Sequence, residues 1–344
     1  MVSGSKVQKL VLADHGSFLG MEKGCFIVRD REGNSKRYPL FEKEIGEVVL
    51  RSGNSVSTGA LASFGFWDID VLICTGRGRP VAMLKGLDDD SHVETRLAQY
   101  EAIKNGKGIE IAKKLVLAKM EGQNIVLRKY GFKLHSEGLR SLIEKVPSDD
   151  LKTAKQKLIS IERKFSEQYL SQIFGLFKES LRPSTRKTYL AYDGLNNIFN
   201  LCYEVLSWKV HKALVRAKLE PYLGFLHSIQ YGKPSLVCDF QELYRYLIDD
   251  FLIGYCEKLR KKDFTVKTET LTRGKTGKRE YLNDFETGEL MRELDLFFEG
   301  RVEIPRIRVG QRQTFETLIN EEALLFAKYL RGELDQWTPR IEVH

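Results

Sequence analysis

Residues 221–245 read PYLGFLHSIQYGKPSLVCDFQELYR, and this segment constrains the fold and the chemistry more closely than any other. It places one histidine, His227, and two carboxylates, Asp239 and Glu242, in otherwise largely apolar sequence. The carboxylates are three residues apart, so they share one face if the segment is helical. Two negative charges in an apolar neighbourhood are costly unless a cation lies between them. The pattern indicates a divalent-metal site that acts on phosphates.

Residue types alone leave a second interpretation of this segment. A histidine in an apolar stretch is more often a hydrogen-bonded core residue, and Asp239 follows an apolar run as a helix N-cap would. Glu242 would then be an ordinary solvated side chain. A third carboxylate would favour the metal site, and the amphipathic helix expected over 158–177 offers Glu162 and Glu167. Glu162 lies beside the apolar stripe, but the pattern alone does not select it.

Composition limits the class of protein. The chain has 344 residues, 42% of them hydrophobic and 30% charged, which is enough for two domains with apolar cores. A net charge of +8 favours a polyanionic partner such as nucleic acid, without requiring one. The five cysteines form no CxxC pair, which predicts free thiols in a reducing cytoplasm. A polar N-terminus and the absence of a run of about 18 apolar residues predict neither a signal peptide nor a transmembrane helix.

Roughly the first 90 residues are typical of β-structure. Short apolar runs alternate with turn sequences that contain Gly16, Gly33 and Gly53, and Ser57 is a suitable cap for one short helix over 57–66. Closely spaced strands favour a small β-sandwich, since a parallel sheet would need longer helical crossovers. A GRGR loop at 76–79 is expected to join the last two strands. The candidate strands are 6–13, 25–28, 37–41, 45–50, 71–74 and 80–84.

The pattern changes at the acidic run 87–91, which suits a helix N-terminus. From there helical periodicity dominates, and we therefore predict an α+β protein of two domains. A β-sandwich-like domain over 1–88 precedes a larger all-α domain over 89–344. The candidate helices are 93–105, 106–129, 137–145, 149–177, 193–218, 239–261 and 316–334.

Other motifs narrow the function further. No GxxxxGK[ST], HExxH or GxSxG motif occurs, and the GxG at 76–78 lacks the third glycine of a dinucleotide fold. Residues 258–279 are rich in lysine and arginine with interspersed threonine and glycine. This segment is expected to be a basic loop, either simply solvated or in contact with a DNA backbone.

Several motifs occur in an order that resembles a known family. ERKFSEQY at 162–169 has an aromatic residue seven positions after Glu162, and LEPYLGFLH at 219–227 is the most specific motif. In this order the chain resembles the CRISPR-associated "Cas one" family of spacer-acquisition integrases and DNA endonucleases. Arg163 stands where the family often has glycine, and the register with Tyr169 favours Glu162 over Glu167. The remaining motifs are RLAQY at 96–100, AKKLVLAKM at 112–120 with Gln123, DGLN at 193–196 with Tyr203, and SLVCDFQELYR at 235–245.

The resemblance implies a set of catalytic metal ligands. Glu162, His227, Glu242 and Asp239 would hold Mg²⁺ or Mn²⁺, and oxygen ligands with one imidazole suit both ions. Which of Asp239 and Glu242 ligates the metal directly stays open. Asp239 could instead orient His227 or accept a proton through water.

The resemblance also implies an activity and partners. The protein would be a metal-dependent integrase and endonuclease of antiviral defence that inserts short DNA fragments as spacers at the leader–repeat end of a CRISPR array. It would form a homodimer through its N-terminal domain and a complex with the second Cas adaptation protein, "Cas two". Two alternatives remain, a catalytically silent DNA-binding scaffold and a metal-dependent nuclease without integration.

Basic side chains near these motifs are candidates for contact with DNA phosphates, although each could equally be ordinary surface charge. Asn196 is expected to satisfy a buried backbone group or a neighbouring helix. The candidate DNA contacts are Lys233, Arg245, Arg182, Arg186, Lys275, Lys278 and Arg279.

Overall fold

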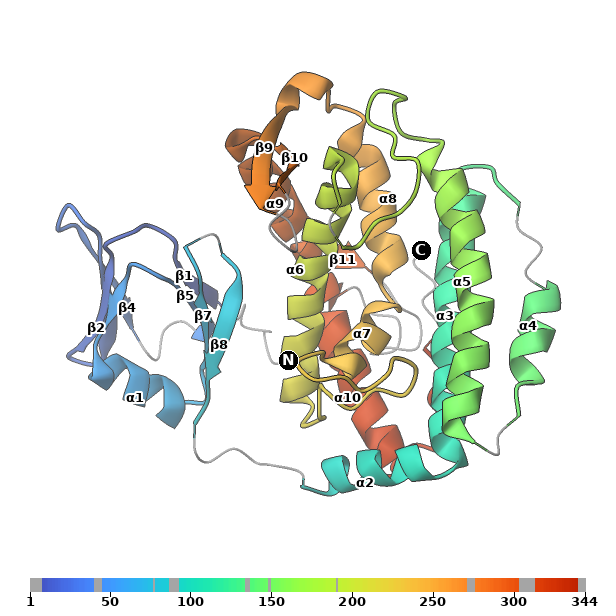
Figure 1. The fold of residues 1–344 in the computed structure, drawn as a ribbon. Coiled ribbons are helices and arrows are strands. Elements are labelled where there is room, and N and C mark those ends of the chain that lie inside the picture. Colours follow the sequence, from blue (N-terminus) through green and yellow to red (C-terminus); the bar gives the residue numbers. More distant parts are fainter. Residues whose placement is uncertain are drawn as a thin grey trace. The chain divides into compact units, whose positions relative to one another are not determined.

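The structure, a computed structural model, divides into two compact units, Met1–Ser91 and His92–His344. Sheets dominate the first unit and helices the second, as Figure 1 shows for each unit. The described residues are 8–39, 45–76, 78–86, 93–133, 137–147, 150–189, 191–270, 276–302 and 313–339.

Within its described residues, the first unit contains two four-stranded sheets and one helix, α1 (Thr58–Phe66), which begins at the N-cap Ser57. The first sheet has the order β1 (Gln8–Leu12), β5 (Ile45–Arg51), β7 (Asp70–Cys74), β8 (Pro80–Leu84). The second has the order β4 (Ser35–Pro39), β3 (Cys25–Arg29), β2 (Phe18–Glu22), β6 (Ser55–Val56).

Parallel pairing in this unit contradicts the expectation drawn from the short strand spacing. β1 pairs parallel with β5, β5 with β7, and β2 with β6. The reason is that the crossovers are not long helices. The strands β2, β3 and β4 of the second sheet connect β1 to β5, while β6 and α1 connect β5 to β7. One apolar core joins both sheets, and within it the rings of Phe26 and Phe64 lie 4.6 Å apart.

The predicted turn at 76–79 does join β7 to β8, which pair antiparallel, although residue 77 lies outside the described residues. The acidic run at 87–91 and the ends of two expected strands, 6–7 and 40–41, also lie outside them. All five cysteines are free thiols, as predicted, and Cys74, Cys202 and Cys256 are buried.

The second unit is built on packed helices, most of which start at a residue with a capping side chain. Asp150 and Asp193, for example, accept hydrogen bonds from backbone N–H groups of the first turn. Figure 1 shows α3 and α5 side by side, and α6 packs against α10. The helices are α2 (Val93–Lys104), α3 (Gly106–Lys129), α4 (Glu137–Glu144), α5 (Leu151–Phe174), α6 (Gly194–Arg216), α7 (Ser235–Gln241), α8 (Arg245–Cys256), α9 (Asp284–Glu299) and α10 (Phe315–Leu330), with a 3₁₀ turn, η1 (Lys261–Asp263).

Two helix predictions were wrong. The single helix expected over 239–261 is interrupted, because α7 ends at Gln241 and α8 begins at Arg245. The helix α9 was not predicted. Its signals were present, since Asn283 caps the backbone of Glu286 in a capping-box pattern and buried apolar residues recur every four positions.

The prediction of an all-α second domain and of a basic loop was also wrong. Strands β9 (Phe264–Thr270) and β10 (Thr276–Leu282) pair antiparallel through most of the basic segment, and residues 271–275 lie outside the described residues. The β-branched residues Thr265, Val266, Thr268 and Thr270 favour this strand conformation. A second short pair consists of β11 (Arg301–Val302) and β12 (Gln313–Thr314).

None of the helices in the described ranges is long and apolar enough to span a membrane.

Candidate active site

A buried lysine brings together two of the predicted carboxylates. Lys119 lies on α3, Glu162 on α5, and Glu242 at the C-cap of α7. The ammonium of Lys119 contacts Oε1 of Glu162 and lies 2.7 Å from Oε2 of Glu242. All three side chains are largely buried. Residues from three helices therefore meet around one positive charge.

The contacts of this lysine explain its charge state. Burial lowers the pKa of Lys119, but the charges of Glu242 and Glu162 raise it above the ordinary value of a lysine. A hydroxyl supports the same cluster, because Ser166 Oγ donates to Oε1 of Glu162 at 2.6 Å. The lysine is therefore charged and is held between the two carboxylates.

The interruption between α7 and α8 gives Glu242 a second cation. Arg245, the first residue of α8, donates from Nη1 to Oε1 of Glu242 at 2.6 Å. Burial raises the pKa of Glu242, whereas the charges of Arg245 and Lys119 lower it, with a result of about 2. Glu242 is therefore ionised at neutral pH although its side chain is only 3% exposed.

Asp239 has a different environment from Glu242. Its carboxylate is fully buried and accepts hydrogen bonds from the backbone N–H groups of Phe225, Leu226 and His227 at 2.5, 3.0 and 2.8 Å. A Cβ atom at Gly224 would lie only 2.7 Å from Oδ2 of Asp239, so this close approach requires glycine. Both oxygens of Asp239 are thus engaged in shaping the 224–227 loop.

Asp239 also orients the histidine. Nδ1 of His227 lies 2.7 Å from Oδ1 of Asp239, and the His227 side chain is 27% exposed. With an Nδ1 proton shared with the carboxylate, Nε2 is the nitrogen whose lone pair is available. The geometry thus matches the predicted alternative in which Asp239 positions His227.

Across the described residues, no three His, Cys, Asp or Glu side chains converge closely enough to coordinate one ion. Lys119 contacts Glu162 and Glu242 where a shared cation would contact them. Oε2 of Glu242 is buried and lies 2.7 Å from the ammonium of Lys119. A divalent cation shared by the two glutamates would take the place of this ammonium, and the donor types suit Mg²⁺ or Mn²⁺.

The alternative glutamate lies elsewhere. Glu167 is exposed on α5, whereas Glu162 faces the cluster. Tyr169, the aromatic residue of the same motif, is fully buried and donates to Asp249 Oδ2 at 2.7 Å. Tyr203 also donates to Asp249, and its ring lies under the Arg245 guanidinium at 4.8 Å.

Sequence reasoning did not single out Lys119, Ser166 or Asp249. Lys119 had one signal, because it is a charged residue among the apolar positions of a long helix. Asp249 likewise interrupts the apolar pattern of α8. Such residues are rarely buried without a partner, so each predicts an ion pair or a hydrogen-bond network.

All four arginines that were predicted to contact DNA donate hydrogen bonds within the protein. Arg182 donates to the carbonyls of Gly175 and Phe177, at 2.9 and 3.0 Å. Arg245 is paired with Glu242 and lies over Tyr203. These contacts hold the ends of helices and the site in place.

Arg186 and Arg279 are also engaged. Arg186 donates to Asn196 Oδ1 at 3.1 Å and to Asn200 Oδ1 at 2.7 Å. Asn196, itself buried, accepts from the backbone N–H of Lys187 and donates to the carbonyl of Thr185, so it satisfies backbone groups of the preceding segment. Arg279 on β10 donates to the Ala191 carbonyl at 2.8 Å and to Glu269 and Asn197.

Of the lysines that were predicted to contact DNA, the two that the structure describes are at least partly exposed. Lys278 is exposed on β10, and Lys233 is partly exposed in the segment that follows His227. Lys275 lies outside the described residues.

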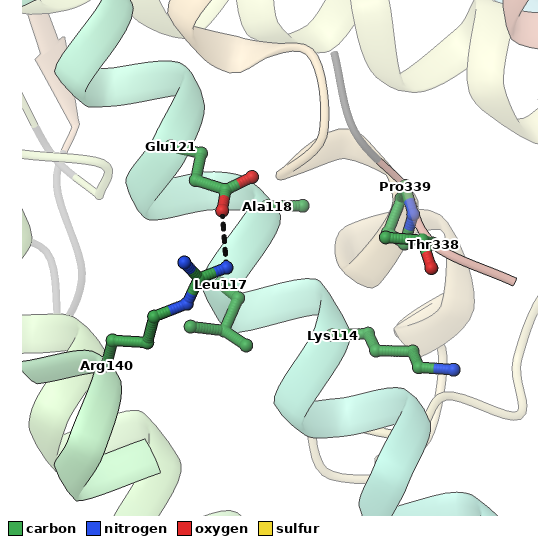
Figure 2. A pocket seen from close by; sticks show the side chains of 7 residues that line it. All are labelled: Lys114, Leu117, Ala118, Glu121, Arg140, Thr338 and Pro339. Carbon is green, nitrogen blue, oxygen red and sulfur yellow. Dashed lines mark hydrogen bonds and ion pairs between the residues drawn. The ribbon is translucent and has the colours of Figure 1, made fainter. Parts of the chain in front are cut away.

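A small hollow on α3 is distinct from this cluster. It lies against Lys114, Leu117, Ala118 and Glu121, and Arg140 of α4 donates to Glu121 at 3.1 Å (Figure 2). Because an α-helix has 3.6 residues per turn, these positions lie on the face of α3 opposite Lys119. The hollow also contacts Thr338 and Pro339 and is not the candidate site.

Comparison with known proteins decides the family. The model of the family described as CRISPR associated protein Cas1 matches residues 10–287. The chain belongs to the Cas1 family. A "CRISPR-associated endonuclease Cas1 2" of Pyrobaculum aerophilum is 30% identical over 254 residues, which cover 73% of this chain and 83% of that relative.

Solved structures have the same fold as this Cas1 family member. A "Casposase bound to integration product" has a TM-score of 0.74 at 18% identity and covers 97% of this chain and 93% of its own. A "Cas6-RT-Cas1–Cas2 complex" has a TM-score of 0.66 at 17% identity and covers 98% of this chain and 37% of that chain.

Proposed function

We propose that the protein is a CRISPR adaptation integrase, a metal-dependent DNA endonuclease and strand transferase that inserts short fragments as spacers at the leader–repeat end of an array. One observation carries this proposal: Glu162 and Glu242 share one buried cation, next to a histidine that Asp239 orients. Glycine at 224 and the break between α7 and α8 are local features that serve this arrangement.

The donor set supports a divalent metal in this role. Glu162, Glu242 and His227 Nε2 would hold Mg²⁺ or Mn²⁺, with Asp239 acting through His227. When bound, the metal would polarise the scissile phosphodiester and offset its developing charge. Arg245 keeps Glu242 ionised, and Asp239 holds the histidine ring in one tautomer.

In the transesterification, the 3′-hydroxyl oxygen of a DNA fragment attacks the phosphorus, and the leaving 3′-oxygen of the array strand takes up a proton. In hydrolysis, water replaces the fragment hydroxyl as nucleophile. Both reactions use the same residues, so the site supports nuclease activity and integration alike. The protein contributes mainly position and charge.

The names of the similar proteins support DNA and a second Cas protein as partners. The relative from Pyrobaculum aerophilum is named an endonuclease, the casposase is bound to an integration product, and another similar structure is a complex that contains Cas2. We extend these to DNA and to the second Cas adaptation protein for this chain. A homodimer formed through the first unit and action on DNA in the cytoplasm belong to the same proposal.

A strand-transfer assay tests the proposal. Purified protein, the second Cas protein, Mn²⁺ or Mg²⁺, a labelled fragment with a free 3′-hydroxyl and a supercoiled CRISPR plasmid are combined, and joining of label to plasmid is measured. We expect joining with the wild type and none with His227→Ala. The variant Glu167→Gln, on the exposed side of α5, is the matched control and should join normally.

The other outcomes separate the alternatives. Joining by His227→Ala would remove this residue from the mechanism. Cleavage that needs neither the second Cas protein nor a repeat, without joining, would favour a nuclease that does not integrate. Salt-dependent DNA binding without cleavage or joining would favour a silent scaffold.

A further inference from the structure

The charges around the two shared carboxylates cancel without any metal. Glu162 and Glu242 contribute two negative charges, and Lys119 and Arg245 contribute two positive charges. The cluster is largely buried, so each charge needs its partner. A divalent cation that enters this arrangement adds two positive charges to a cluster that is already neutral.

Lys119 occupies the position that a divalent cation shared by Glu162 and Glu242 would take. Its ammonium contacts both carboxylates, and in the described residues no third acceptor for it is observed. An ion that is shared by Glu162 and Glu242 must therefore displace the ammonium from at least one of them. Arg245 contacts the other oxygen of Glu242 and is not in the same position.

We infer that Lys119 is a built-in counter-ion that competes with the divalent metal for Glu162 and Glu242, so that the metal binds tightly only when DNA phosphates are also present. A phosphate supplies the negative charge that balances the metal and gives the displaced ammonium a new partner. The two ligands then assist each other, and by linkage the metal strengthens DNA binding by the same factor. This inference rests on the proposed function, in which these carboxylates are metal ligands.

Mn²⁺ binding measured without any reaction tests the inference. The electron paramagnetic resonance signal of free aqueous Mn²⁺ is followed during titration of the DNA-free protein. We expect Lys119→Gln to bind Mn²⁺ at least about tenfold more tightly than the wild type. Lys119→Arg keeps the competing charge and should bind like the wild type. Lys114→Gln, paired with Glu110 elsewhere on α3, is the matched control and should also bind like the wild type.

A short DNA duplex gives a second measurement that needs no variant. Its addition should tighten Mn²⁺ binding by the wild type at least about tenfold, and by Lys119→Gln much less. If Lys119→Gln does not fold without metal, this measurement on the wild type decides. Equal Mn²⁺ affinity with and without duplex, or Lys119→Gln binding no tighter than the wild type, would overturn the inference.

Glu162→Gln separates this failure from a failure of the proposed metal site. Loss of Mn²⁺ binding in Glu162→Gln, with no gain in Lys119→Gln, would leave the metal assignment standing and remove only the competition. Unchanged Mn²⁺ binding in Glu162→Gln would show that the ion binds elsewhere and would overturn both.

Discussion

Nδ1 of His227 lies 2.7 Å from Oδ1 of Asp239, and the same carboxylate accepts three consecutive backbone N–H groups. A single buried side chain therefore sets both the path of the 225–227 loop and the direction of the ring at its end. The ring cannot turn without disturbing a carboxylate that also holds the backbone.

Asp239→Asn should therefore impair both stability and activity. An amide has one acceptor oxygen and presents N–H groups to the backbone donors, so the loop loses hydrogen bonds worth about 1–3 kcal/mol in unfolding free energy. Misdirection of His227 should lower Mn²⁺-dependent plasmid nicking about 10–100-fold. Denaturant unfolding and a nicking time course measure the two effects.

Asp250→Asn is the control for that experiment, because Asp250 is a neighbouring carboxylate on α8 that pairs with Lys129 near the surface. It should change unfolding and nicking little. If Asp239→Asn nicks DNA at the wild-type rate, the orientation of His227 is not needed for the chemistry.

Substitution of Glu162 and substitution of Glu167, both on α5, should have very different effects on plasmid nicking. Glu162→Gln removes a candidate metal ligand and should lower plasmid nicking at least about 100-fold, the upper end of the effect of an outer-sphere partner. Glu167→Gln changes an exposed side chain and should have no effect. If both variants melt at nearly the same temperature, the difference in nicking comes from the candidate site and not from stability. Loss of nicking in both variants would contradict the assignment of Glu162 as the metal ligand.

Asp249 should make stability depend on pH. Burial raises its pKa to about 6, against which the hydrogen bonds from Tyr203 and Tyr169 and the charges of Arg245 and Arg186 act only partly. The folded state then holds a proton that the unfolded state releases near pH 4. Stability from this group is complete below about pH 4 and is lost as pH rises through about 6, by up to about 3 kcal/mol.

The variant Asp249→Asn lacks this titration and isolates it. The unfolding free energy of the wild type minus that of Asp249→Asn should fall as pH rises from about 4 to 6 and be constant above that range. Urea unfolding across this pH range measures the difference. A difference that is independent of pH would show that the carboxyl keeps an ordinary pKa.

DNA affinity should depend on the lysines rather than on Arg279. Lys278→Gln and Lys233→Gln should each reduce the slope of log affinity against log salt by about 0.9, as expected for one lost phosphate contact. Arg279→Gln should instead lower the melting temperature, because its guanidinium holds the Ala191 carbonyl and Asn197. A salt slope that changes only in Arg279→Gln would reverse this assignment.

Local signals in the sequence predicted most helices correctly. Capping residues such as Asp150 and Asp193 lie next to apolar periodicity, so their helices begin where expected. No glycine or proline lies at the break after Gln241, so the sequence carries no local signal for it. It serves the pairing of Glu242 with Lys119 and Arg245, which is a tertiary requirement, and local propensity does not encode it.

The candidate site was predictable in its residue types but not in its arrangement. Motif order selected Glu162, His227, Asp239 and Glu242 together. That Asp239 would support the backbone while Glu242 faced Glu162 depends on the folding of a loop around Gly224. The position of Lys119 on α3 predicts an ion pair, but not that Glu162 and Glu242 are its partners, since both are distant from it in sequence.

The interleaving of the two sheets in the first unit has a consequence for how the chain matures. In the described residues β1 has no partner until β5 follows three strands that belong to the other sheet, and β6 returns to that other sheet before β7 and β8 complete the first. The first sheet is not a continuous piece of chain, because β2, β3 and β4 of the second sheet lie between β1 and β5. During synthesis the first sheet cannot begin to pair until β5 has emerged. An N-terminal fragment that ends before β5 should keep the paired strands β2, β3 and β4 but leave β1 without its partner strand and prone to aggregation.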